Sequence, residues 1–176
     1  MNNFWEKLKK PTMVLAPMYD VTDSAFRFII AKYGKPDVMW TEFVSADGLC
    51  SDIGRIKLLH HLDFNPIEKP IVAQLFGKYP EKMRAAASLV SRLGFDGIDI
   101  NMGCPDKNMM KQGSCAALFH NPELAQQIIL SAKQGAPELP VSVKIRIGDS
   151  GIDWKEWIKQ LLIAKPAAIT IHLRTR

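Results

Sequence analysis

Short β-rich apolar runs alternate along this chain with longer segments of helical period, and this alternation restricts the fold more than any other feature. Repeated strand–helix units predict an α/β protein whose parallel sheet is covered by helices. No GxGxxG or GxxxxGKS/T phosphate loop follows a strand, which favours a (β/α) barrel over a doubly wound nucleotide-binding sheet. The predicted strands are Met13–Pro17, Val38–Val44, Pro70–Phe76, Gly97–Met102, Val141–Ile147 and Ala168–Leu173.

Helix start and stop signals lie between these strands. Asp23 is predicted to cap a helix that ends at Gly34, and Asn121 with Pro122 opens another that ends at Gly135. A third begins at Pro80 and stops at Gly94, and a tryptophan-rich helix precedes the last strand. The predicted apolar faces are Phe26, Ile29, Ile30 and Tyr33; Met83, Ala86, Ala87, Val90 and Leu93; Leu124, Ile128 and Ala132; and Trp154, Trp157, Ile158, Leu161 and Leu162.

Polar residues share one phase of several strands, near the carboxyl ends of those strands. Residues two apart in a strand lie on one face, so Lys144 and Arg146 share a face, as do Asp99 and Asn101. A (β/α) barrel has its active site at that end of its strands. The alternative is a set of hydrogen-bonded interior polar residues, and agreement among five strands favours a site.

Composition excludes two classes of protein. The 176 residues, 47% hydrophobic and 23% charged, fit one globular domain. No apolar run approaches the roughly 18 to 20 residues of a membrane helix, and the start of the chain lacks the apolar stretch of a secretory signal. We therefore expect a cytoplasmic protein without a membrane partner.

The cysteines and the net charge limit the kinds of cross-link, metal site and partner that we expect. Cys50, Cys104 and Cys115 are odd in number and lack CxxC spacing, which argues against a disulfide framework and a metal site. The net charge of +5 and the pI near 9.1 are compatible with a polyanionic partner, although many proteins of this charge bind none.

Six motifs occur in order along nearly the whole chain from Met13 onward. They are Ala16-Pro17-Met18, Thr41-Glu42-Phe43-Val44, Ala73-Gln74-Leu75-Phe76-Gly77, Asn101-Met102-Gly103-Cys104-Pro105, Val143-Lys144-Ile145-Arg146 and His172-Leu173-Arg174-Thr175. Together they resemble the tRNA-dihydrouridine synthase family. The resemblance implies a TIM barrel that uses FMN and NADPH to reduce the C5=C6 bond of uridines in tRNA.

The reaction needs a general acid, and Cys104 is the candidate. Hydride transfer from flavin N5 to uracil C6 leaves charge toward C5, so a proton donor must stand on the opposite face of the base. An ordinary thiol has a pKa of about 8.5 and is mostly protonated near neutrality. Cys50 and Cys115 are interpreted as inert small core residues.

The resemblance also implies a flavin site and a base site. Lys144 matches the lysine beside the flavin ring, where a cation stabilises charge on reduced flavin. Pro17, Met18 and Gln74 match residues that contact the isoalloxazine, and His172 matches one that also reaches toward the base.

Two residues are assigned to the substrate. Asn101 offers an amide to the uracil edge, and Arg174 would meet tRNA phosphate or the target nucleotide. The polar segment 107–112 is expected to be either a solvated loop or a flexible cover over the base pocket.

The chain departs from the family pattern at Leu173, where glycine is usual, and at Cys115, where small residues are usual. We expect residues 1–176 to be the N-terminal portion of an FMN-binding TIM-barrel domain of eight strands, here incomplete with about six strand–helix units. The C-terminal strands and the helical tRNA-binding domain would then lie outside this sequence. The full-length protein is expected to be monomeric.

Two alternatives stay open from the sequence. One is another FMN barrel that reduces a free pyrimidine or an enone. The other is a non-catalytic RNA-binding remnant. The lack of strands seven and eight, whose following loops bind phosphate in such barrels, favours it, and the intact Cys104, Lys144 and His172 disfavour it.

Overall fold

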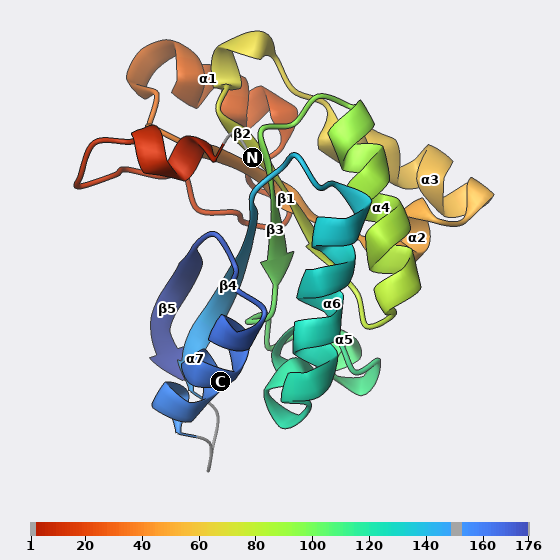
Figure 1. Cartoon of the computed structure of the whole chain (residues 1–176). Coiled ribbons are helices and arrows are strands. Elements are labelled where there is room, and N and C mark those ends of the chain that lie inside the picture. The colour runs from red at the N-terminus through yellow and green to blue at the C-terminus, as the bar shows by residue number, and fades with distance from the viewer. Residues whose placement is uncertain (1–2, 149–152, 176) are drawn as a thin grey trace.

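A parallel five-stranded sheet in the order β1-β2-β3-β4-β5 forms the centre of the computed structural model, which describes residues 3–148 and 153–175 (Figure 1). The sheet alternates with helices, as predicted, and fits the first part of a TIM barrel. The first and last residues of each strand lie within two residues of the predicted bounds. They are β1 (Met39–Ser45), β2 (Ile71–Phe76), β3 (Gly97–Asn101), β4 (Val141–Gly148) and β5 (Ile169–Thr175).

The predicted strand Met13–Pro17 is wrong. This segment runs parallel to the start of β1, but it forms only the single bridge between Val14 and Val38. The Leu15 amide donates to the Val38 carbonyl at 3.0 Å. Two residues on, the next donor of a parallel ladder would be Pro17, which has no N–H. The ladder therefore stops, and the chain turns away at the carboxyl end of the sheet.

Helices follow the strands where the capping signals predicted them. Asp23 accepts a hydrogen bond from the Phe26 amide at 2.7 Å, and Asn121 accepts one from the Leu124 amide at 3.1 Å. Among the described residues, no helix is both long and apolar enough to cross a membrane. The α-helices are α1 (Ser24–Gly34), α2 (Ala46–Leu49), α3 (Asp52–Leu58), α4 (Pro80–Arg92), α5 (Lys107–Lys111), α6 (Pro122–Gly135) and α7 (Trp154–Ile163); the 3₁₀ turns are η1 (Phe4–Lys7), η2 (Leu59–Leu62), η3 (Pro66–Glu68) and η4 (Cys115–His120).

The main apolar core lies between the sheet and the two long helices α4 and α6, which lie side by side along one face of the sheet (Figure 1). Met83 and Val90 of α4 and Ile128 of α6 are buried as predicted. The two helices approach closely at Gly135, where an added Cβ would lie 2.1 Å from the Arg84 carbonyl oxygen. Only glycine fits there.

The predicted apolar face of α1 is wrong at three of its four residues, whereas the fourth, Ile30, is half-buried against the main core. Phe26, Ile29 and Tyr33 are 38%, 52% and 76% exposed, and the one buried residue of this helix is Arg27. The Arg27 Nε donates to the Glu68 carboxylate at 2.7 Å, and the guanidinium also donates to the Thr22 carbonyl at 2.7 Å and to that of Asp63. A cation thus anchors α1 to η3, because a buried carboxylate and two carbonyls satisfy its donors.

The opposite face of the sheet is apolar near the amino ends of the strands. Trp40 and Val72 form a second core there, against which Phe4, Trp5 and Leu8 of the N-terminal segment pack. The rings of Trp5 and Trp40 have centroids 5.6 Å apart. The N-terminal segment therefore covers the inner face of the sheet at the amino ends of β1 and β2.

We expect Arg27→Met to lower the free energy of unfolding by about 3–5 kcal/mol, because it leaves the buried Glu68 carboxylate without its cation. Urea unfolding would measure the change. The matched control is Arg92→Met, on the exposed surface of α4, which should shift stability by less than about 0.5 kcal/mol. Replacing both partners, Arg27→Met with Glu68→Leu, should recover most of the loss. A small effect of the single change would contradict the anchoring role.

Candidate active site

A cavity of about 320 Å³ opens at the carboxyl ends of the strands. It draws its walls from the segment before α1, from β1, from the turn after β3 and from β4 and β5. Phe43 and Arg146 also line it, although neither was predicted as a site residue. The predicted site residues that line this cavity are Pro17, Met18, Asn101, Cys104, Lys144 and His172.

Two predicted site residues do not line the cavity. Gln74 is fully buried in β2, and both ends of its amide are bonded to protein side chains. Arg174 is exposed near the end of β5. Gln74 thus supports the site from below, and Arg174 lies on the solvent side of it.

A buried polar network ties β2, β3 and β4 beneath the cavity. The Asp99 carboxylate accepts hydrogen bonds from the Gln74 amide and the Ser142 hydroxyl, both at 2.6 Å. The Asn101 amide nitrogen donates to the Gln74 oxygen at 3.2 Å. Burial raises the pKa of Asp99 to about 6, against the effect of these bonds and of the nearby Lys144 cation. The polar phase of these strands is therefore partly structural.

The same network places Cys104. The Asn101 side-chain oxygen accepts hydrogen bonds from the amides of Gly103 and Cys104, at 3.1 and 3.0 Å. The Gly103 carbonyl accepts from Arg146 Nε at 2.7 Å, and an added Cβ at Gly103 would lie 3.0 Å from the Ile145 carbonyl carbon. The turn therefore packs tightly against β4, and this packing fixes Cys104 beside the cavity at the carboxyl ends of the strands.

The environment of Cys104 corrects the expectation of an ordinary thiol. Its pKa falls to about 6, chiefly because the Cys115 side chain hydrogen-bonds to it, helped by a backbone hydrogen bond at Asp106 and by the Arg146 charge. The same contact and burial raise the pKa of Cys115. Cys115 was interpreted as an inert core residue, but in the structure it lies beside Cys104, the candidate acid, and changes its pKa.

Cations gather on the β4 and β5 side of the cavity. Lys144 is half-buried and pairs with Asn101 in register, and burial lowers its pKa while Asp99 opposes that shift. Slight burial, together with the charges of Lys144 and Arg146, lowers the pKa of His172. This side of the cavity suits a planar group that carries negative charge.

A second cavity of about 470 Å³ adjoins the first and shares Phe43 and Cys104 with it. Its aromatic wall is continuous: Tyr19 stacks on Phe43 with centroids 5.1 Å apart, and Phe43 meets the edge of Phe76 at 5.4 Å. His61 faces the same space and is held at 3.0 Å by the Glu42 carboxylate. Cys104 therefore stands between a cationic cavity and an aromatic one.

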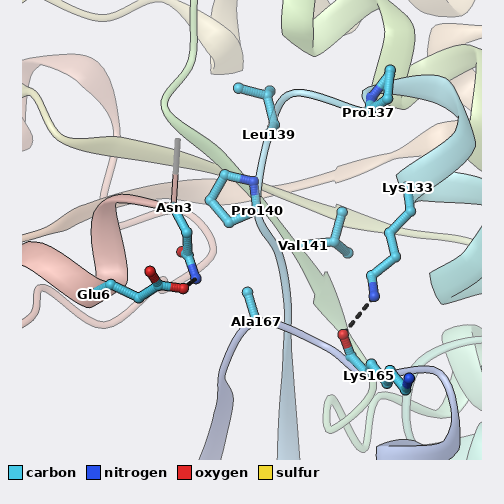
Figure 2. Close-up of a pocket in the computed structure, with 9 residues that line it drawn as sticks. All are labelled: Asn3, Glu6, Lys133, Pro137, Leu139, Pro140, Val141, Lys165 and Ala167. Carbon is cyan, nitrogen blue, oxygen red and sulfur yellow. Dashed lines mark hydrogen bonds between the residues drawn. The ribbon is translucent and has the colours of Figure 1, made fainter. Parts of the chain in front are cut away.

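A smaller cavity of about 200 Å³ lies at the opposite, amino ends of β4 and β5 (Figure 2). Two of its charged side chains, Lys133 and Glu6, are hydrogen-bonded within the protein. Lys133 donates to the carbonyls of Ala164 and Lys165, which follow the end of α7, and Asn3 donates to Glu6 at 3.0 Å. These contacts close helix and chain ends, so we interpret this cavity as structural.

Comparison with known proteins shows the family to which this chain belongs. The sequence profile described as "Dihydrouridine synthase (Dus)" matches residues 14–176. The chain belongs to this family.

Relatives with assigned names agree with the profile. The chain is 43% identical over 175 residues to "Probable tRNA-dihydrouridine synthase 2" of Bacillus subtilis (strain 168). It is 42% identical over 175 residues to "Probable tRNA-dihydrouridine synthase" of Staphylococcus aureus (strain COL) and to the protein of that name in Staphylococcus epidermidis (strain RP62A). Each alignment covers 99% of this chain and 53% of the relative, so the chain spans about half the length of the curated relatives it matches.

Sequence reasoning missed Arg146 and Cys115. The first shares the strand phase of Lys144, so the phase argument contained the signal needed to find it. The contact of Cys115 with Cys104 spans an irregular turn and the short helix α5, and no sequence period links the two residues.

The lowered pKa of Cys104 predicts a pH profile for its alkylation by iodoacetamide, because the thiolate is the reacting form. The rate should be half-maximal near pH 6. In Cys115→Ala the midpoint should move up toward the ordinary thiol value of about 8.5, since the main cause of the shift is removed. Cys50 is the internal control, because burial raises its pKa. An unchanged midpoint in the variant would contradict this assignment.

Proposed function

We propose that this chain forms the catalytic core of an enzyme that reduces uridine in tRNA to 5,6-dihydrouridine, with FMN as its cofactor and NADPH as reductant. The observation that carries the proposal is the cavity that brings Cys104 together with Lys144 and His172. Residues 1–176 would supply the first five strands of the FMN-binding barrel. The identities of the relatives support the tRNA-modifying role.

The cavity fits a flavin ring in its chemistry. Pro17 and Met18 offer apolar contact on one side, and Lys144 and Arg146 offer positive charge on the other. When bound, FMN supplies the hydride that adds to C6 of the uracil. Lys144 would hold its ammonium against the pyrimidine side of the ring and stabilise negative charge there.

Cys104 would deliver a proton to C5 of the uracil. Its pKa near 6 lies close to the working pH, which is where a general acid is most efficient. A base stacked over the turn excludes water from Cys104, and lost solvation favours the neutral thiol. Asn101 holds the turn and uses one N–H of its amide on Gln74, so the other is available to a uracil carbonyl.

The substrate is proposed to be RNA because of the second cavity. Tyr19, Phe43 and Phe76 form an aromatic wall of the kind on which unstacked bases lie. The net charge of +5 favours a polyanion. A free pyrimidine would leave most of this second cavity unused, which makes the other FMN reductases the weaker candidate.

The choice of oxidant tests the function in the full-length protein. After anaerobic reduction by NADPH, tRNA lacking dihydrouridine should reoxidise the bound flavin and gain dihydrouridine, whereas free uridine or an enone should not. Flavin absorbance and nucleoside mass spectrometry report the two events. Rapid reoxidation by the small molecules would support the alternative FMN reductase, and a protein that binds no flavin would support the RNA-binding remnant.

Cys104→Ala should slow tRNA reduction by roughly 100- to 10,000-fold while leaving flavin binding and flavin reduction by NADPH intact, since only proton delivery is lost. Stopped-flow absorbance separates the two half-reactions. Cys50→Ala is the control, because this residue lies outside both cavities and contacts the Lys82 carbonyl. Equal losses in the two variants would reject Cys104 as the acid.

A further inference from the structure

Two of the three cysteines meet beside the cavity. Cys115 opens η4, and its side chain hydrogen-bonds to that of Cys104. The backbones are also joined, because the Ala116 amide donates to the Cys104 carbonyl at 3.2 Å. The two cysteines are therefore neighbours, at the ends of a turn that this backbone hydrogen bond closes.

The two thiols differ in access and in reactivity. Cys104 is half-buried and borders both cavities, so a small solute reaches it. The thiolate is its main form at neutral pH, and thiolates are the species that peroxides oxidise. Cys115 is fully buried, and the reactive sulfur within its reach is that of Cys104.

We propose that Cys104 and Cys115 are a redox modification site, at which a hydroperoxide converts the two thiols into a reversible disulfide. The Cys104 thiolate attacks one oxygen of hydrogen peroxide, the O–O bond breaks, and the departing hydroxide takes a proton to become water. Cys104 is then a sulfenic acid. The Cys115 sulfur loses its proton and attacks the Cys104 sulfur, and the S–O bond breaks to release a second water. In total two thiols are oxidised by two electrons and one peroxide is reduced to two waters.

The second step is assisted by the first. The pKa of Cys115 is raised chiefly by its hydrogen bond to Cys104 and by burial, and also by the Cys104 charge. Oxidation removes that negative charge, so Cys115 gives up its proton more readily. A disulfide needs Cα atoms roughly 4.4–6.8 Å apart, and the bonded backbone at Ala116 keeps the two cysteines near one another without unfolding.

The remaining cysteine lies elsewhere. The Cys50 thiol donates to the Lys82 carbonyl at 3.4 Å, and burial raises its pKa. Cys50 is therefore a slow-reacting thiol and serves as a reference within the same molecule. A disulfide at Cys104 would also withhold the proton donor from uridine; this consequence rests on the proposed function, whereas formation of the disulfide does not.

The experiment exposes the full-length protein, without tRNA, to hydrogen peroxide, alkylates the remaining thiols and maps the peptides by mass spectrometry. We expect one peptide pair that joins Cys104 to Cys115 and disappears after dithiothreitol, with Cys50 still alkylated. In Cys115→Ala the linked pair should be lost and Cys104 should proceed to sulfinic acid, with a slower first oxidation than in the parent sequence because its pKa is higher. Cys50→Ala should behave like the parent sequence.

Three results would overturn the proposal: oxidation of Cys104 to sulfinic acid in the parent sequence, a disulfide through Cys50, or a link between two molecules. Peptide mapping of the parent sequence needs no variant, so the test stands if Cys115→Ala fails to fold. Cys115→Ser is the second variant, because serine closely matches cysteine in size. Loss of tRNA reduction without a linked peptide would concern the proposed function alone.

Discussion

The buried Asp99 carboxylate is the interaction on which the rest of this site depends. A buried carboxylate without partners would cost several kcal/mol, and here it accepts from Gln74 and Ser142. These partners come from the strands on either side, so the network fixes the register of β2, β3 and β4 at the level of the cavity. Asn101 extends the network to the turn that carries Cys104. The position of the reactive thiol is therefore set by the sheet interior and only secondarily by its loop.

The inner face of the sheet changes character along its length. Near the amino ends it is apolar and covered by Phe4 and Trp5, in the middle it is polar and internally bonded, and at the carboxyl ends it carries Lys144 and Arg146. Each zone excludes water to a different degree, which raises the pKa of Asp99 and lowers that of Lys144. A negatively charged ligand at the carboxyl ends of the strands would meet both Lys144 and Arg146.

The parts of the fold that follow local rules were predictable. Strand period, the caps at Asp23 and Asn121 and the proline at Pro80 depend on neighbours in sequence, and the structure agrees at each. Two features depend on distant partners and were not predictable: the burial of Arg27 needs Glu68, and the interaction of Cys115 needs Cys104. The truncated pairing of residues 13–17 follows instead from Pro17, which has no N–H to continue the ladder. Most of the candidate site could be predicted because barrel geometry brings the carboxyl ends of the strands together. Gln74 was misplaced because a strand face can hold both buried structural residues and residues that line a cavity, and the strand period does not distinguish them.

The cysteine pair places a constraint on the chemistry of the site. A general acid must hold its proton, but the hydrogen bond from Cys115 stabilises the Cys104 thiolate and so favours the deprotonated form. The protonated state then depends on what covers the turn, because desolvation by a bound base reverses part of the shift. In the proposed reaction, Cys104 would be a nucleophile while no base covers the turn, and an acid once a base does. A thiolate that solvent can reach is readily oxidised. Cys115 favours the thiolate form of Cys104 and is also the neighbouring thiol with which Cys104 could form a disulfide. Thus the contact with Cys115 sets the acidity of Cys104 and, through the thiolate, its reactivity toward oxidants. In our proposal the same contact supplies the thiol for a disulfide that can be reduced again.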